Sequence, residues 1–140
     1  MDARAEVQAA SQPASLLKRA LRGNAAFSVV SGAVLVVEAP FLAPIMGIPS
    51  PLALTVTGIV LLPFGLLLWW LAGREELART VGWIAIELDV LWVAGSIALL
   101  LSGWLPLTTA GNWIIALLAD AVAMFAVLQY LGVRRLATGS

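Results

Sequence analysis

The 140-residue chain is too apolar to be a soluble domain. Hydrophobic residues make up 61% of it, charged residues only 11%, and the mean hydropathy is +1.00, whereas soluble domains contain about 25% charged residues. Cysteine and histidine are both absent, which excludes disulfides, thiol chemistry, zinc sites built from these residues and His-ligated haem. The formal net charge of zero says nothing by itself about nucleic acid, because the charged residues are segregated by depth in the membrane, and we expect no nucleic-acid partner. We predict one domain, residues 1–140, embedded in a lipid bilayer.

Four apolar segments are each long enough to cross a bilayer, because about 20 helical residues at ~1.5 Å per residue cover its ~30 Å core. Before them, residues 1–15 are expected to form a loose tail, and residues 16–23 an interfacial helix or an extension of the first span. The spans lie at about 25–45, 52–71, 81–101 and 113–131. This pattern predicts an all-α fold, a bundle of four antiparallel transmembrane helices.

Basic residues predict the orientation of this bundle. They occur only in the N-terminal segment, between the second and third spans, and after the fourth, and four spans would place these three segments on one side of the membrane. By the positive-inside rule both termini are then cytoplasmic, in a multi-pass protein of the inner (cytoplasmic) membrane. The eight basic residues are Arg4, Lys18, Arg19, Arg22, Arg74, Arg79, Arg134 and Arg135.

The first span carries a polar stripe that ends on an acid. Asn24, Ser28, Ser31, Leu35 and Glu38 follow spacings of i, i+4, i+7, i+11 and i+14, which places them on one narrow face of a helix. This stripe runs from the cytoplasmic edge toward the outer leaflet, where Glu38 lies. The second span contains no acid.

The third span contains two acids on different faces. Gly82, Asp89, Ser96 and Gly103 recur every seven residues, a small and polar seam that lets membrane helices approach closely. By the helical rise, Asp89 lies near the membrane midplane. Glu87 is about 200° around the helix from Asp89, so it faces elsewhere. It could reach a second helix, a water-filled vestibule or an oligomer partner, or be hydrated from the cytoplasm, and it remains a candidate ion-binding residue.

Acids within the spans suggest transport. Asp120 in the fourth span lies slightly beyond the midplane, and no basic residue lies within any span. Each acid is therefore expected to be protonated or paired with a bound cation. We predict a small carrier or channel-like protein for protons, small cations or cationic solutes, with Asp89 central, Asp120 and Glu38 as relays, and Ser31 and Ser96 beside them. Interhelical hydrogen bonding, at ~0.6 kcal/mol each on average, is the structural alternative.

Two other functions remain open. The chain could be a non-enzymatic accessory or assembly subunit of a larger membrane complex, or a homo-oligomer. It could also bind an apolar ligand, such as a lipid, quinone or carotenoid, between helices walled by Trp83, Trp92 and Met124. We do not expect an enzyme, a metal site or a cofactor, because histidine is absent and Asp89 lies in AIELDV rather than in the GxGD motif of intramembrane aspartyl proteases.

Overall fold

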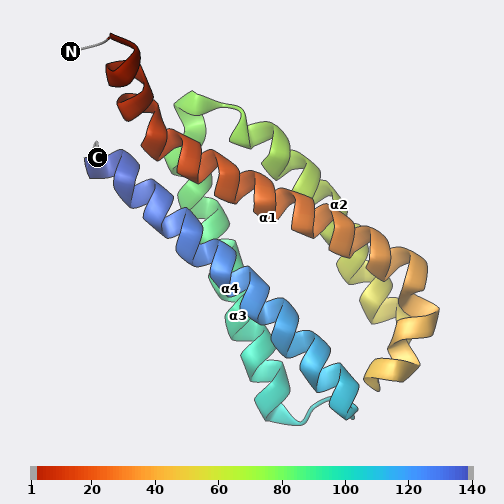
Figure 1. The fold of residues 1–140 in the computed structure, drawn as a ribbon. Helices are drawn as coiled ribbons and strands as arrows, with labels where there is room; N and C mark the ends of the chain where they lie inside the picture. The colour runs from red at the N-terminus through yellow and green to blue at the C-terminus, as the bar shows by residue number, and fades with distance from the viewer. Residues whose placement is uncertain (1–2, 139–140) are drawn as a thin grey trace.

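The computed structural model describes the backbone of residues 3–138 and the side chains of residues 3–4 and 16–136. The helices are α1 (Ala3–Met46), α2 (Pro51–Ala72), α3 (Ala78–Ser102) and α4 (Thr109–Thr138), and a short 3₁₀ helix, η1 (Glu75–Leu77), precedes α3. Both ends of the described chain lie at the same end of the bundle (Figure 1). The remaining described residues form the short connections between these helices.

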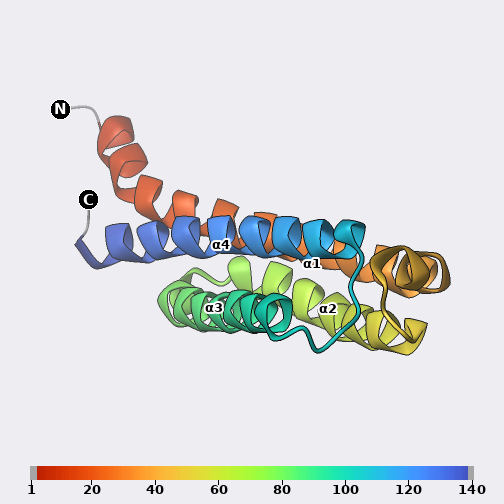
Figure 2. The ribbon, with the colours of Figure 1, turned by 90° about the horizontal axis from the view of Figure 1, so that it is seen from below.

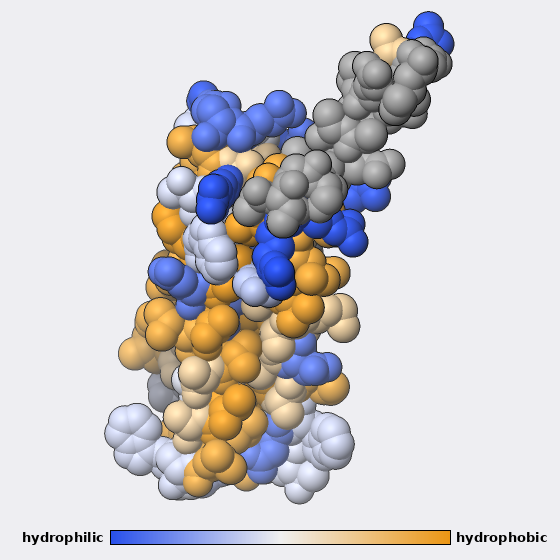
Figure 3. Space-filling view, turned by 90° about the vertical axis from the view of Figure 1, so that its left-hand side faces the viewer, coloured by the Kyte–Doolittle hydropathy of each residue, from blue (hydrophilic) through white to orange (hydrophobic). Residues whose placement is uncertain are grey.

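All four α-helices are long and apolar enough to cross a membrane. The segments that meet this criterion are Leu16–Met46, Pro51–Ala72, Glu75–Ser102 and Thr109–Leu136. Figure 3 shows the corresponding hydrophobic belt, with hydrophilic residues gathered at the end where the N-terminal segment emerges. The all-helical fold with four candidate spans is confirmed, and by their length and composition these spans indicate a multi-pass membrane protein.

The backbone of the N-terminal segment is helical. Helix α1 runs from Ala3 to Met46, so residues 16–23 lie in the same helix as the predicted first span. Leu17 and Leu21, one turn apart, are buried and pack in a cluster with Val81 of α3 and Val133 of α4. These contacts stabilise the part of α1 that precedes the predicted span.

The bundle consists of two helix pairs. Helix α2 packs mainly against α1, helix α3 packs mainly against α4, and the contact between α1 and α4 joins the pairs. Figure 2 shows α1 and α4 in one layer, with α2 and α3 in the other. Because α2 and α3 contact each other only weakly, the second layer is held together less tightly than the first.

Glycines allow α1 and α2 to approach closely. A Cβ atom added to Gly58 would lie 2.6 Å from the carbonyl oxygen of Gly32, and one added to Gly65 would lie 2.8 Å from that of Ala25. Backbone atoms cannot move away as a flexible side chain can. Small residues at these positions therefore set the distance between the two helices.

Two apolar clusters close the two ends of the bundle. The first surrounds Leu17 and Leu21, and the second surrounds Met46 and Ile48 at the far end. At that far end the Thr108 backbone N–H donates to Met46 O (3.0 Å), and the Gly111 N–H donates to the Thr108 hydroxyl, which caps α4. The pairs are therefore joined at both ends, and the candidate site lies between these joints.

Candidate functional site

A buried polar cluster joins three of the four helices. Asp89 of α3 is 4% exposed, Asn24 of α1 is 1% exposed and Gln129 of α4 is fully buried. The side-chain amides of Asn24 and Gln129 both donate to Asp89 Oδ2, at 2.8 and 2.6 Å. Asn24 Nδ2 also donates to Gln129 Oε1 at 3.1 Å, and Ser28 Oγ donates weakly to Asn24 Oδ1 at 3.5 Å. These bonds fix the position of the carboxyl group.

The carboxyl group of Asp89 has neutral partners and one unused oxygen. Both of its described hydrogen bonds end on Oδ2, and no described residue donates to Oδ1. Oδ1 is also not among the described atoms that are both buried and without a partner. Asp89 lines the cleft described next, so Oδ1 is available to a group that enters it. No described basic residue forms an ion pair with Asp89.

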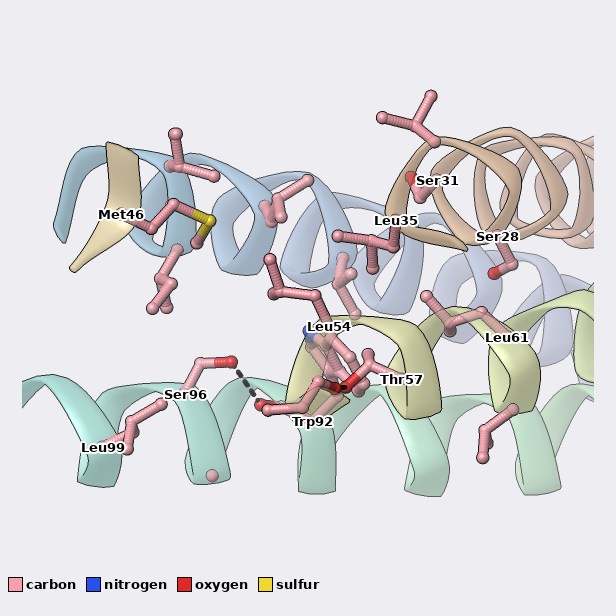
Figure 4. Close-up of a pocket in the computed structure, with 18 of the residues that line it drawn as sticks. Ser28, Ser31, Leu35, Met46, Leu54, Thr57, Leu61, Trp92, Ser96 and Leu99 are labelled. Atoms are coloured by element: carbon pink, nitrogen blue, oxygen red, sulfur yellow. Dashed lines mark hydrogen bonds between the residues drawn. The ribbon is translucent and has the colours of Figure 1, made fainter. Parts of the chain in front are cut away.

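An apolar cleft of about 970 Å³ leads to this cluster. It lies between the α1–α2 pair and the α3–α4 pair, and all four helices contribute to its walls. Figure 4 shows Ser28, Ser31 and Leu35 of α1 on one side of it, with Trp92 of α3 on the other. Apart from Asn24, Asp89 and a few hydroxyls, its described lining is apolar. A volume of this size fits a drug-sized organic molecule.

The hydroxyl groups of the cleft are mostly occupied within their own helices. Thr57 Oγ1 donates to Ala53 O at 2.8 Å, and Ser96 Oγ donates to Trp92 O at 2.8 Å. Both bonds follow the common i to i−4 pattern for such residues in helices. Asp89 is therefore the strongest acceptor that a ligand in this cleft would meet.

The structure separates the four acids singled out from the sequence. Asp89 lies in the cleft wall, whereas Glu38, Glu87 and Asp120 are exposed on the outer surface and do not line the cleft. Asp120 is nine residues from Gln129, two and a half turns, so it lies on the opposite face of α4. Glu38 and Asp120 are therefore not brought to Asp89 within one copy of the chain.

The other predicted residues are divided in the same way. Ser31, Ser96 and Trp92 line the cleft with Asp89. Trp83 instead stacks edge-on against Tyr130, with ring centroids 6.0 Å apart, on the outer surface. Met124 is 60% exposed and does not line the cleft. One of the three proposed wall residues, Trp92, therefore lies where an apolar ligand would be bound.

Sequence reasoning did not assign a site role to the two amides that hold Asp89. The sequence pattern places Asn24 on the polar stripe of the first span, but it does not single out Gln129. Its signal is visible in retrospect, because Gln129 is an amide among the apolar residues of AVAMFAVLQYLG. Such a residue in an apolar helix usually finds an interhelical partner.

No protein-family model, curated protein or solved structure matches this chain. The function is therefore argued from the geometry of the cleft and its polar end.

Proposed function

We propose that the chain is a membrane carrier for a cationic solute with a large apolar part, and that Asp89 binds the positive charge. The observation that carries this proposal is a buried carboxyl group with one free oxygen at the polar end of an apolar cleft. The apolar part of the solute would occupy the space between the helix pairs. The positive charge of the solute would pair with the carboxyl group of Asp89, which forms no ion pair with a described basic residue.

The chemistry of the walls favours an apolar cation over a small ion. A small hard cation requires several oxygen ligands, and the described residues contain no group of three acids or other metal-ligating side chains that could hold one. An organic cation needs only one carboxylate and gains free energy by burying its apolar surface, ~25 cal/mol per Å². The apolar lining supplies that surface along the whole cleft.

The electrostatics of the site supports the same choice. An isolated carboxylate in a low-dielectric environment is unfavourable unless it is protonated or paired with a cation. Two neutral amides stabilise its negative charge in part, and a bound cation would complete the compensation. A proton that binds the carboxylate of Asp89 would release the cation, so this one site could exchange the solute for a proton.

The proposal includes an orientation. The bundle would be antiparallel, in the inner (cytoplasmic) membrane, with both termini in the cytoplasm, because the basic residues at the terminal end of the bundle favour that side. Asp89 would then face a cleft whose far end, around Met46 and Pro49, is toward the outer leaflet.

Uptake into liposomes tests the transport step. Purified full-length protein would be reconstituted, and entry of the aromatic cation ethidium followed by its fluorescence on enclosed DNA, under an imposed proton gradient. We expect uptake above that of protein-free liposomes, lost in Asp89→Asn. Asp120→Asn is the matched control, because the same chemical change is made at an exposed acid outside the cleft. Equal rates in wild type and Asp89→Asn would contradict the proposal.

The exposed acids favour a second candidate function, a subunit of a membrane assembly. Glu38, Glu87 and Asp120 lie within the apolar segments but outside the packed interior. An acid at the centre of a lipid-facing helix costs ~2.5–3.5 kcal/mol on insertion scales, and a hydrogen bond to a neighbouring helix would offset that cost. Native mass spectrometry from lipid nanodiscs tests this function: a homo-oligomer or a stoichiometric partner would support it, and a monomer alone would contradict it.

A further inference from the structure

A second pocket, outside the cleft, lies on the surface between α1 and α2. It has a volume of about 490 Å³ and is lined by Lys18, Arg19, Arg22, Gly23, Ala26 and Trp69. Its three cationic residues belong to residues 18–22 of α1, and that part of the helix lies at the end of the bundle where the chain termini lie (Figure 1). No acidic residue lines it among residues 16–136, whose side chains the structure describes. The pocket therefore concentrates positive charge without an anion to balance it.

Arg22 is held in place, and no described acidic residue forms an ion pair with it. Its guanidinium carbon lies 5.0 Å from the centre of the Trp69 ring, a cation–π contact that orients the side chain. Its Nε atom is buried and has no hydrogen-bond partner among the described residues. A planar guanidinium can donate two parallel hydrogen bonds to a phosphate or carboxylate. Because Nε is enclosed, an anion in the pocket would be bound through the terminal nitrogens of Arg22, which are not among the buried atoms without a partner. The fixed positive charge, which has no acidic partner among the described residues, points to an anion as the missing partner.

The neighbouring Arg74 makes the same kind of cation–π contact with a tryptophan, but it also has an acidic neighbour. Its guanidinium carbon lies 4.5 Å from the centre of the Trp70 ring, and Glu76 lies 3.8 Å from its Nη1 atom. Arg22 and Arg74 thus form adjacent arginine–tryptophan pairs. Only the second of these two has a described acidic neighbour in the chain.

The surface that continues from the pocket is apolar. On α1, Arg22, Ala26 and Ala33 are spaced by four and seven residues and so share one face, and both alanines are exposed. On α2, Leu66 lies one turn from Trp69 toward the middle of the bundle and is 63% exposed. A charged pocket that borders an exposed apolar surface fits a molecule with an anionic head and a hydrocarbon tail.

We propose that this pocket binds the phosphate group of an anionic phospholipid, with Arg22 as its central contact and Lys18 and Arg19 beside it. The lipid chains would lie on the exposed apolar surface of α1 and α2 that borders the pocket. Basic residues at a membrane surface attract anionic lipids in general. A fixed Arg22 would make this one lipid position preferred over the other positions around the protein. This site is independent of the cleft and of the cation proposed there.

Native mass spectrometry of the full-length protein tests this site. The protein would be released from nanodiscs that contain equal amounts of phosphatidylglycerol and phosphatidylcholine, and the retained lipid would be counted. We expect wild type to retain phosphatidylglycerol preferentially, and Arg22→Gln to retain roughly tenfold less because a charge-assisted hydrogen bond is lost. Arg74→Gln is the matched control and should retain as much as wild type, because its arginine already has Glu76.

A third variant and a competitor make the result decisive. Arg19→Gln removes an exposed cation of the same pocket without changing a buried contact, so a smaller loss of phosphatidylglycerol is expected even if Arg22→Gln folds poorly. No preference for phosphatidylglycerol in wild type would overturn the proposal, as would equal losses in Arg22→Gln and Arg74→Gln. Displacement of the lipid by millimolar inorganic phosphate would show a site for free phosphate and overturn the assignment to a lipid.

Discussion

At the scale of single residues, Asp89 is held by two neutral amides, and this arrangement decides how the position tolerates substitution. Both donors meet one oxygen of the carboxyl group, so that oxygen has a structural role and the other is free for a ligand. An asparagine at this position can present its own oxygen to both amides. A leucine cannot, and it would leave a buried N–H group of Gln129 without an acceptor.

We predict that Asp89→Leu lowers the free energy of unfolding by ~1–3 kcal/mol, the usual cost of a buried donor that has lost its acceptor. Asp89→Asn should change it by at most ~1 kcal/mol, because both hydrogen bonds can be kept. Unfolding of the purified protein by SDS in mixed micelles measures both values. Equal losses in the two variants would show that the negative charge, rather than the hydrogen-bond pattern, holds the three helices together.

Part of this site could be predicted from the sequence. A helical seam of period seven identified Asp89 as an inward-facing acid at mid-depth, and it is buried in the structure. The same reasoning could not place Glu38 and Asp120 relative to Asp89, because depth and face along one helix do not determine which helices are neighbours. Gln129 was missed for a related reason: an amide becomes recognisable as a partner only when the facing residue is known.

At the scale of helices, contact between backbones holds α1 against α2. Gly58 of α2 and Gly32 of α1 meet without side chains between them. The sequence predicted that there are four long apolar helices, because apolar length and turn residues depend only on local sequence, but it did not predict that α1 begins as early as Ala3. The pairing of helices, by contrast, depends on such contacts between distant residues.

Two glycine-to-alanine changes separate helix propensity from helix contact. Gly58→Ala should lower the free energy of unfolding by ~1–3 kcal/mol, because its Cβ would lie 2.6 Å from a backbone oxygen and overpack the contact. At Gly95 of α3 a Cβ atom would meet nothing within 4 Å, so Gly95→Ala should leave stability unchanged or raise it by up to ~1 kcal/mol. Equal effects at the two positions, measured by unfolding in SDS, would contradict this account of the α1–α2 contact.

At the scale of the whole molecule, the two helix pairs meet at both ends and leave the middle open. Apolar clusters and the Thr108 contacts close the ends, whereas the weak contact between α2 and α3 leaves the cleft unfilled between them. Four spans of this length could have been packed without such a space. The cleft is therefore the property of the fold that most directly suggests binding, and no single segment of the sequence revealed it.

Filling the cleft should block binding without unfolding the protein. Gly95 lines the cleft, and neighbouring Ala94 is exposed and does not. We predict that Gly95→Phe weakens binding of an apolar cation by roughly tenfold or more, because the ring occupies the ligand's space, and that Ala94→Phe has little effect. Isothermal titration calorimetry of both variants checks this prediction. Equal affinities would place the ligand elsewhere on the molecule.

The measurement that tests the central claim most directly compares two ligands of nearly the same shape and opposite charge. Tetraphenylphosphonium and tetraphenylborate would be titrated by calorimetry into full-length protein in zwitterionic nanodiscs, with empty nanodiscs as the blank. Because a carboxylate at Asp89 attracts only the cation, wild type should bind the phosphonium ion, and Asp89→Asn should bind it roughly tenfold more weakly, while Asp120→Asn binds it like wild type. Equal affinity for the two ions, or an affinity for the cation that does not change in Asp89→Asn, would contradict the account.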